Sequence, residues 1–254
     1  IRDTDRSRGL GDVYKRQEMV ASTYDFAGYE YIFIWLDDFN AFEAKVMYNE
    51  LFSKLLKALN NIGKKPIMAY GGYESIILCN TNSPARLYGV AQSVGYGEYR
   101  AITPVGGGMP VNKYYFLPTH CRMRFDDVAR ILSEHGYFSA RKSEKEHALD
   151  YYRDICNCGI CHEIIRDDIN GFSAYNDSIP YTVKTRNGIL TKNRPTTDAT
   201  LIAAIHFLNC KVFEWNYIEN EDLSTVLDNL KSCYAQYQPK LAGHINKWCE
   251  IYGK

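Results

Sequence analysis

The stretch Asp154-Ile-Cys-Asn-Cys-Gly-Ile-Cys-His162 places three cysteines within six residues, at Cys156, Cys158 and Cys161. No hydrophobic run surrounds them that would explain their burial as ordinary core residues. The C-x-C-x-x-C spacing lets three thiolates converge on one ion at about 2.3 Å each, as a tetrahedral zinc site requires. Soft sulfur ligands favour zinc or an iron–sulfur cluster over magnesium or calcium. The stretch therefore predicts a metal site, and three free thiols in a loop are the alternative.

A fourth ligand has to come from elsewhere in the chain. His162 is adjacent to the cysteines but strained for that role. His206 lies on a predicted helix that is capped by Asp198 and carries the apolar residues Leu201, Ile202, Ile205 and Leu208. Because a helix presents a ligand rigidly, we expect His206 to complete the site. Four protein ligands leave no open position for water, so the predicted zinc is structural.

Composition places few limits on function. The chain has 254 residues, and its 30 Lys and Arg residues equal its 30 Asp and Glu residues. No global charge therefore indicates nucleic acid, although a local basic groove is compatible with neutrality. Eight cysteines without a recognisable signal peptide favour a reducing compartment, which we expect to be the cytoplasm. No apolar run approaches the length of a membrane span.

Residues 1–17, which read IRDTDRSRGLGDVYKRQ, have no apolar periodicity and are too acidic for a targeting peptide. They resemble translated adapter DNA of the kind that contaminates sequence assemblies. We therefore exclude them from the fold and expect that the chain is a fragment whose gene begins further upstream.

The rest of the chain alternates predicted strands and helices. A continuous apolar run over Tyr29–Leu36 predicts a fully buried strand of the parallel type that ends in Asp37-Asp38. Asn40 with Glu43 in capping-box position predicts the start of a helix that stops at Gly63. Further strands are predicted over Pro66–Tyr70, Arg86–Val94, Lys113–Pro118 and Tyr137–Ala140, further helices over 124–135, 221–237 and 240–252, and a polar insertion or irregular hairpin over 167–197.

Polar residues and glycines collect where the predicted strands end. This order favours an α/β fold, either a (β/α)8 TIM barrel or an open parallel sheet, with the site at the carboxyl ends of the strands. Only about five strands are predicted, which an N-terminally truncated barrel would explain. We expect residues 18–150 to be the C-terminal half of a barrel and residues 151–254 to be a zinc-binding subdomain with C-terminal helices.

With these pieces placed, the chain resembles the tRNA-guanine transglycosylase superfamily, and most closely its DNA-acting DpdA-type branch. The zinc signature of that family, C-x-C-x-x-C followed by a helical His, is similar to the four predicted ligands. Its purine-reading strand end resembles Trp35-Leu36-Asp37-Asp38, and its Gln-Gly-Gly turn resembles Tyr70-Gly71-Gly72-Tyr73 with Tyr in place of Gln. Its Gly-Glu strand end resembles Ser93-Val94-Gly95-Tyr96-Gly97-Glu98.

The resemblance implies an enzyme, a pentosyltransferase that exchanges guanine in DNA or tRNA for a 7-deazaguanine base. Asp37, with Asp38 as the fallback, would read the donor edge of the base. Gly71, Gly72 and Gly97 would let the backbone approach the flat base, and Glu98 would order that loop. The implied partners are nucleic acid, with DNA favoured, and the incoming base; a dimer is compatible with the resemblance, and no membrane is involved.

Two departures from the family keep other interpretations open. The first three or so barrel strands are missing, and the nucleophilic aspartate has no counterpart in residues 136–146, so the catalytic residue is unassigned. Asp126 and Asp127 lie nearby but open the preceding predicted helix. One alternative is a catalytically inactive, zinc-stabilised paralogue that binds nucleic acid or a partner. A metal-dependent hydrolase or deaminase is disfavoured because no H-x-E motif precedes the cysteines.

Overall fold

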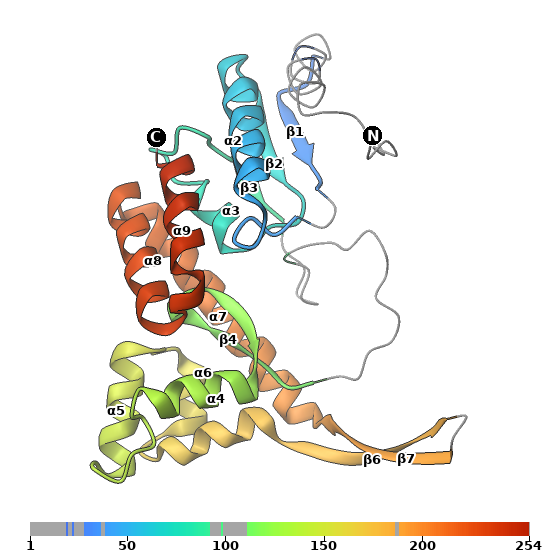
Figure 1. The fold of residues 1–254 in the computed structure, drawn as a ribbon, viewed down its shortest axis with the longest axis vertical. Helices are drawn as coiled ribbons and strands as arrows, with labels where there is room; N and C mark the ends of the chain where they lie inside the picture. The colour runs from blue at the N-terminus through green and yellow to red at the C-terminus, as the bar shows by residue number, and fades with distance from the viewer. Residues whose placement is uncertain are drawn as a thin grey trace. The chain divides into compact units, whose positions relative to one another are not determined.

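The computed structural model describes Met19, Ser22, Glu98 and residues 28–36, 39–91, 111–185 and 188–253. The chain divides into two compact units, which we treat separately (Figure 1). Unit 1 takes in residues 1–102, 217–232 and 239–254, and unit 2 takes in residues 103–216 and 233–238. This division differs from the boundary at residue 150 that the sequence predicts. The excluded segment 1–17 lies outside the described residues.

Unit 1 contains a sheet of three parallel strands in the order β1-β2-β3. The strands are β1 (Tyr31–Ile34), β2 (Lys65–Met68) and β3 (Gly89–Val90), and they are connected through α2 (Val46–Asn61) and α3 (Tyr73–Ile77). Parallel neighbours need such crossovers, so the strand–helix alternation predicted for this region is confirmed. Gly63, with φ of 73°, adopts the left-handed conformation that commonly ends a helix, as predicted.

Two predictions about this region are wrong. Strand β1 is not fully buried: Ile32 and Ile34 are buried, but Tyr31 and Phe33 on the opposite face are 50% and 69% exposed. Successive side chains of a strand point to opposite faces, and within the described residues only one face of β1 is covered. Helix α2 begins at Val46 instead of at a capping box, because Asn40 accepts the N–H of Phe42 in a local turn.

The C-terminal helix of unit 1 packs on α2. Helix α9 (Pro239–Tyr252) places Trp248 against Phe42, with ring centroids 5.2 Å apart. The hydroxyl of Tyr252 donates to the backbone oxygen of Asn49, 3.0 Å away. Helix α8 (Leu223–Tyr237) begins where Asp222 accepts the N–H of Thr225, which caps its first turn. The two C-terminal helices are therefore confirmed to within two residues at each end.

Unit 2 does not continue the parallel sheet. Strand β4 (Lys113–Phe116) turns back through the short 3-10 segment η1 (Leu117–Thr119) and pairs antiparallel with β5 (Cys121–Arg124). His120 supports the reversal with φ of 51°, a conformation uncommon for a residue with a side chain. The predicted TIM barrel is therefore not present among the described residues, which form a mixed α/β structure with few strands.

Three helices surround this hairpin: α4 (Phe125–Glu134), α5 (Glu144–Asp154) and α6 (Gly159–Ile165). Helix α4 agrees with the helix predicted over 124–135, whereas the strand predicted at Tyr137–Ala140 is a turn. A 3-10 segment, η2 (Ile169–Asn176), follows and leads into the hairpin of β6 (Ser178–Thr185) and β7 (Gly188–Pro195). The long helix α7 (Thr197–Asn220) then begins with Thr196, not the predicted Asp198, accepting the N–H of Ala199.

Among the described residues, no helix combines the length and the apolarity needed to cross a lipid bilayer.

Candidate metal centre

The three cysteines lie at the junction of two short helices in unit 2. Helix α5 begins with a full capping box, in which Ser143 and Glu146 each accept a backbone N–H of the other. Cys156 and Cys158 follow the end of this helix, and Cys161 lies in the first turn of α6. Gly171 holds η2 close to α6, since an added Cβ would lie 2.5 Å from the backbone oxygen of Ile164. Tight local packing therefore holds the three thiols together.

His206 completes the cluster as the sequence predicts. Its Nδ1 lies 3.9 Å from Cys156 Sγ, 3.3 Å from Cys158 Sγ and 3.4 Å from Cys161 Sγ. All four ligand atoms lie within 4.8 Å of one another. A tetrahedron with metal–sulfur bonds of about 2.3 Å and a metal–nitrogen bond of about 2.0 Å has sulfur–nitrogen edges of roughly 3.5 Å. The four residues could thus hold one metal ion at its ordinary bond lengths.

The second ring nitrogen of His206 fixes the orientation of the imidazole. Its Nε2 lies 2.8 Å from the backbone oxygen of Tyr115 and donates to it, so Nδ1 is the ring nitrogen that faces the sulfurs. The ring also stacks on Tyr114, with centroids 4.3 Å apart. A backbone carbonyl that accepts the distal N–H is a common support of metal-binding histidines. His162 points elsewhere: it stacks on Tyr152 and contacts Asn157.

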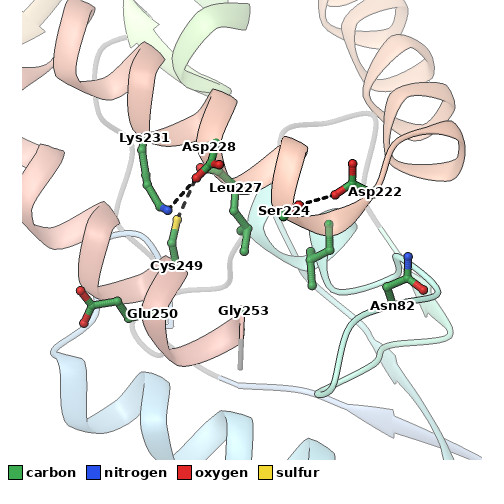
Figure 2. Close-up of a pocket in the computed structure, with 10 residues that line it drawn as sticks. Asn82, Asp222, Ser224, Leu227, Asp228, Lys231, Cys249, Glu250 and Gly253 are labelled. Atoms are coloured by element: carbon green, nitrogen blue, oxygen red, sulfur yellow. Dashed lines mark hydrogen bonds and ion pairs between the residues drawn. The ribbon is translucent and has the colours of Figure 1, made fainter.

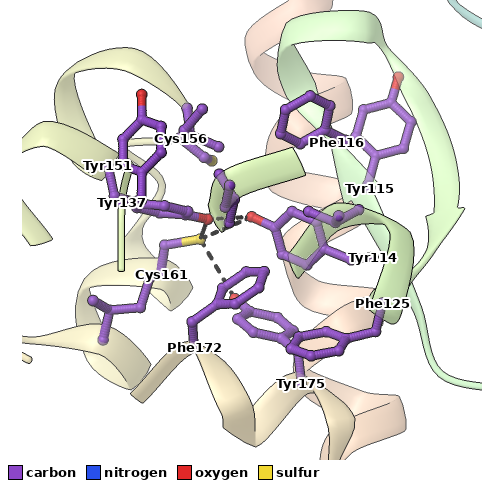
Figure 3. Close-up of a cluster of buried hydrophobic side chains, with 14 of the residues drawn as sticks. Tyr114, Tyr115, Phe116, Phe125, Tyr137, Tyr151, Cys156, Cys161, Phe172 and Tyr175 are labelled. Atoms are coloured by element: carbon purple, nitrogen blue, oxygen red, sulfur yellow. Dashed lines mark hydrogen bonds between the residues drawn. The ribbon is translucent and has the colours of Figure 1, made fainter. Parts of the chain in front are cut away.

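Three buried tyrosines converge on Cys161 (Figure 3). Their hydroxyls lie 3.7 Å (Tyr114), 3.4 Å (Tyr151) and 3.4 Å (Tyr175) from its Sγ. Burial, together with the nearby sulfur charge, raises the pKa of Tyr114 and Tyr151 well above the ordinary value, so both hydroxyls stay protonated. They can therefore donate to a thiolate, and these hydrogen bonds offset part of the free-energy cost of burying its charge. Nothing in the sequence around these tyrosines indicated this role.

The charges of the cluster favour an ionised sulfur at Cys161. Burial alone would raise the pKa of this thiol, but hydrogen bonds from Cys156 and Cys158 and the neighbouring His206 hold it well below its ordinary value. Burial alone would likewise lower the pKa of His206, but the Cys161 charge and hydrogen bonds with the thiols raise it to about 10. A bound cation would take the place of the protons, as metal binding to such sites does.

The donor set fits a thiophilic divalent ion. Three sulfurs and one imidazole nitrogen in a closed, buried arrangement are compatible with structural zinc and unlike the oxygen sites of magnesium or calcium. Cys210, one helical turn after His206, lies 3.9 Å from Cys156 Sγ but outside the group of four whose ligand atoms all lie together. A metal here would join α5, α6 and α7.

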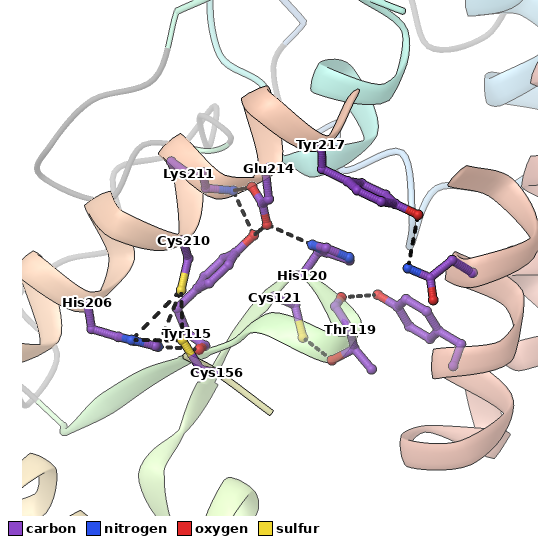
Figure 4. A network of polar contacts seen from close by, with 12 residues as sticks. Tyr115, Thr119, His120, Cys121, Cys156, His206, Cys210, Lys211, Glu214 and Tyr217 are labelled. Carbon is purple, nitrogen blue, oxygen red and sulfur yellow. Dashed lines mark hydrogen bonds and ion pairs between the residues drawn. The ribbon is translucent and has the colours of Figure 1, made fainter. Parts of the chain in front are cut away.

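A second polar cluster lies further along α7 (Figure 4). The fully buried Glu214 accepts the hydroxyl of Tyr115, lies 2.7 Å from Nδ1 of His120 and pairs with Lys211 at 3.0 Å. Burial would raise the pKa of Glu214, but Lys211 and His120 lower it below the ordinary value. The four-residue spacing of His206, Cys210 and Glu214 places Glu214 on the same helix face as His206, but nothing in the sequence links Glu214 to Tyr115 or His120.

The base-reading residues predicted from the resemblance fall in unit 1. Asp37, Asp38 and Gly97 lie outside the described residues, and Glu98 is half-buried. Gly71 and Gly72 follow β2 as predicted, but the space that their missing side chains leave is filled by the chain itself. An added Cβ would lie 2.4 Å from Ser75 Oγ at Gly71, and 2.4 Å from Glu74 Oε2 at Gly72. The contact of these glycines with a base therefore stays a prediction.

Unit 1 also has a pocket of about 440 Å³ (Figure 2). Helices α8 and α9 supply most of its lining, with Asp222, Asp228, Lys231 and Glu250 as the charged residues. Lys231 is paired with Asp228 at 2.9 Å, and burial raises the pKa of the Cys249 thiol to about 12. Since the lining has no aromatic ring on which a base could stack, this pocket does not favour base binding.

No family model, curated protein or solved structure matches this chain in the three comparisons with known proteins.

Proposed function

We propose that this chain belongs to a zinc-stabilised transglycosylase that exchanges guanine in nucleic acid, with DNA favoured over tRNA, for a 7-deazaguanine base. In such a reaction a carboxylate attacks C1′ of the sugar, and guanine leaves from C1′ and takes up a proton. The incoming base then loses its N9 proton, bonds to C1′ and releases the carboxylate. The nucleophile is unassigned, and the parallel strands β1 to β3 would be part of a barrel.

The Cys156, Cys158, Cys161 and His206 cluster carries the proposal. It brings together the four residues on which the family resemblance is most specific, a C-x-C-x-x-C motif and a helical histidine 45 residues after the last cysteine. The supports of the site, a carbonyl on His206 and tyrosines around Cys161, are those of a permanent structural metal. These supports favour zinc as the ion that the site would hold.

The parallel strands of unit 1 lend a second, weaker support. Because β1 and β2 are parallel neighbours, their carboxyl ends lie at one edge of the sheet, where α/β proteins commonly bind ligands. Trp35 and Tyr70 meet beyond these strand ends, with ring centroids 5.3 Å apart. Aromatic rings at that edge offer a surface on which a purine could stack.

A base-exchange assay tests the proposal. The zinc-loaded protein would be incubated with labelled guanine or a labelled 7-deazaguanine, and with duplex DNA and tRNA in separate reactions. We expect label to enter DNA, to be lost in Asp37→Ala, and to be kept in Asp126→Ala, which removes an equal charge from an exposed position in α4. Zinc content of each variant would be measured in parallel.

One observation favours the non-catalytic alternative. Among the described residues, the buried carboxylates are Glu74 and Glu214, and both are engaged with neighbours: Glu74 accepts the N–H of Gly72, and Glu214 contacts Tyr115 and His120. Neither is placed as a nucleophile for a sugar. Stoichiometric zinc without exchange into either polymer would therefore indicate a binding or partner paralogue and reject the transglycosylase.

A further inference from the structure

The β6–β7 hairpin differs in charge from the rest of the chain. The chain as a whole is neutral, but residues 178–197 hold four basic residues, Lys184, Arg186, Lys192 and Arg194, and no acidic residue. The nearest acidic residues are Asp177 and Asp198, which bracket the hairpin. A local positive charge of this size attracts polyanions whatever the net charge of the protein.

The hairpin is long and exposed. Each strand has eight residues, and the two strands pair with each other along their whole length; within the part of the chain that the structure describes, no other strand joins them. Figure 1 shows the pair as a ribbon that extends past the helices of unit 2. Ile179, Ile189 and Leu190 are 42%, 72% and 45% exposed, so the ribbon is not held by burial of its apolar residues. An isolated two-stranded ribbon is only marginally stable in water, which favours a partner that covers it.

Strand register gathers aromatic and basic side chains on one face. Directly opposite residues share a face, and the pairs Tyr181–Lys192 and Ile179–Arg194 are of that kind. The guanidinium of Arg194 lies 5.9 Å from the centre of the Tyr181 ring, within range of a cation–π contact. One face thus carries two cations, an aromatic ring and aliphatic groups.

We propose that the β6–β7 hairpin is an arm that binds duplex DNA by entering its major groove. That groove, about 12 Å wide, admits a two-stranded ribbon, whose strands lie about 4.8 Å apart. Cations at the ribbon's edges contact phosphates, and aliphatic groups contact thymine methyls. The deep, narrow major groove of A-form RNA does not admit such a ribbon. The inference stands on charge and register alone, and holds equally for a catalytic and a non-catalytic protein.

Salt-dependent DNA binding tests the arm. Fluorescence anisotropy with a labelled 30-base-pair duplex would compare the wild type with the triple variant Lys184→Gln, Lys192→Gln, Arg194→Gln. If each cation contacts one phosphate, the slope of log affinity against log salt becomes less steep by about 2–3, and affinity at ~0.1 M salt falls on the order of a hundredfold. The matched control, Lys45→Gln, Lys240→Gln, Lys247→Gln, removes three exposed charges from unit 1 and should bind like the wild type.

Other results would overturn the arm. One is equal affinity and equal salt slope for the hairpin variant and the control. Another is that double-stranded RNA of the same length competes as well as DNA. The third is that the protein is a dimer and that the double variant Ile189→Ser, Leu190→Ser separates the dimer without changing DNA binding. Zinc content and thermal unfolding of each variant show that unit 2 is folded. Exchange activity separates this proposal from the previous one. If the protein exchanges bases but its DNA binding does not depend on the hairpin, the arm alone is rejected. If DNA binding depends on the hairpin but no base is exchanged, the transglycosylase alone is rejected.

Discussion

Helix α7 carries two buried polar clusters whose charges are compensated in different ways. At His206, three sulfurs converge on one ring nitrogen in an arrangement that an ion could neutralise. Two turns later, at Glu214, a carboxylate is neutralised within the chain by Lys211 and His120. The first cluster could bind an ion from solution, whereas the second is paired within the chain.

Tyr115 connects the two clusters. Its backbone oxygen accepts the Nε2 proton of His206, and its hydroxyl donates to Glu214. Lys211 also donates to that hydroxyl, 2.7 Å away, and lies 4.4 Å from the centre of the ring. A change of the Tyr115 side chain removes the contact with Glu214 but leaves the backbone oxygen that accepts from His206. The two clusters can therefore be perturbed one at a time.

The largest effect is expected from breaking the metal cluster. In Cys161→Ala the site loses a ligand that is buried and approached by three tyrosine hydroxyls. Structural zinc sites of this ligand type supply on the order of 10 kcal/mol of binding free energy, so unit 2 should lose its cooperative unfolding transition. Zinc content by atomic emission should fall from one ion per chain to near zero, and a chelator should have the same effect on the wild type.

Cys79→Ala is the matched control for this prediction, since Cys79 lies in unit 1, where its thiol donates to the backbone oxygen of Ser75. This variant should retain its zinc and the unfolding transition of unit 2. Full zinc content in Cys161→Ala would show that the four residues do not form the metal centre.

A smaller but still large effect is expected at the second cluster. Replacing Glu214 by Leu leaves the buried Lys211 cation and the His120 ring without their carboxylate, and removing one partner of a buried ion pair typically costs about 3–5 kcal/mol. Chemical denaturation should show this loss while zinc content stays at one ion per chain. Loss of zinc together with stability would show that the two clusters act as one.

The carboxylate also predicts a dependence on pH. The pKa of Glu214 in the folded chain lies below its ordinary value of 4.5, because Lys211 and His120 outweigh the effect of burial. The folded state therefore binds this proton less readily than the unfolded state, and the stabilisation is complete above pH 4.5 and declines as the pH falls further. The unfolding free energy of Glu214→Gln should consequently fall less steeply than that of the wild type below pH 4.5.

The difference between the clusters also explains what the sequence could predict. Three of the candidate ligands lie within six residues, and thiols at that spacing have few uses other than metal binding, so only His206 had to be found at a distance. The members of the second cluster come from two segments: Tyr115 and His120 on one side, Lys211 and Glu214 on the other. Each residue type is ordinary in its own segment, and only the folded chain brings them together.

The same reasoning applies to the fold. The boundaries of α2 at Gly63 and of α9 were predictable, because glycine termination and apolar spacing act locally. The antiparallel pairing of β5 with β4 depends on a left-handed backbone conformation at His120, which cannot be predicted from a histidine at that position. The exposed face of β1 was mispredicted for a related reason: an apolar run indicates what a strand could bury, but not whether both of its faces are covered.

The smallest and most selective effect is expected from removing single hydroxyls beside each cluster. Tyr151→Phe deletes a donor to Cys161 Sγ, and Tyr115→Phe deletes a donor to Glu214, with the carbonyl that orients His206 left in place. Loss of an outer hydrogen bond typically lowers metal affinity 10–100-fold, so competition with a chelator should show a weaker site in Tyr151→Phe and an unchanged one in Tyr115→Phe. Tyr115→Phe should instead lose about 1–3 kcal/mol of stability, because a buried carboxylate loses a donor. Equal metal affinities in the two variants would mean that the tyrosines around Cys161 fill space without supporting its charge.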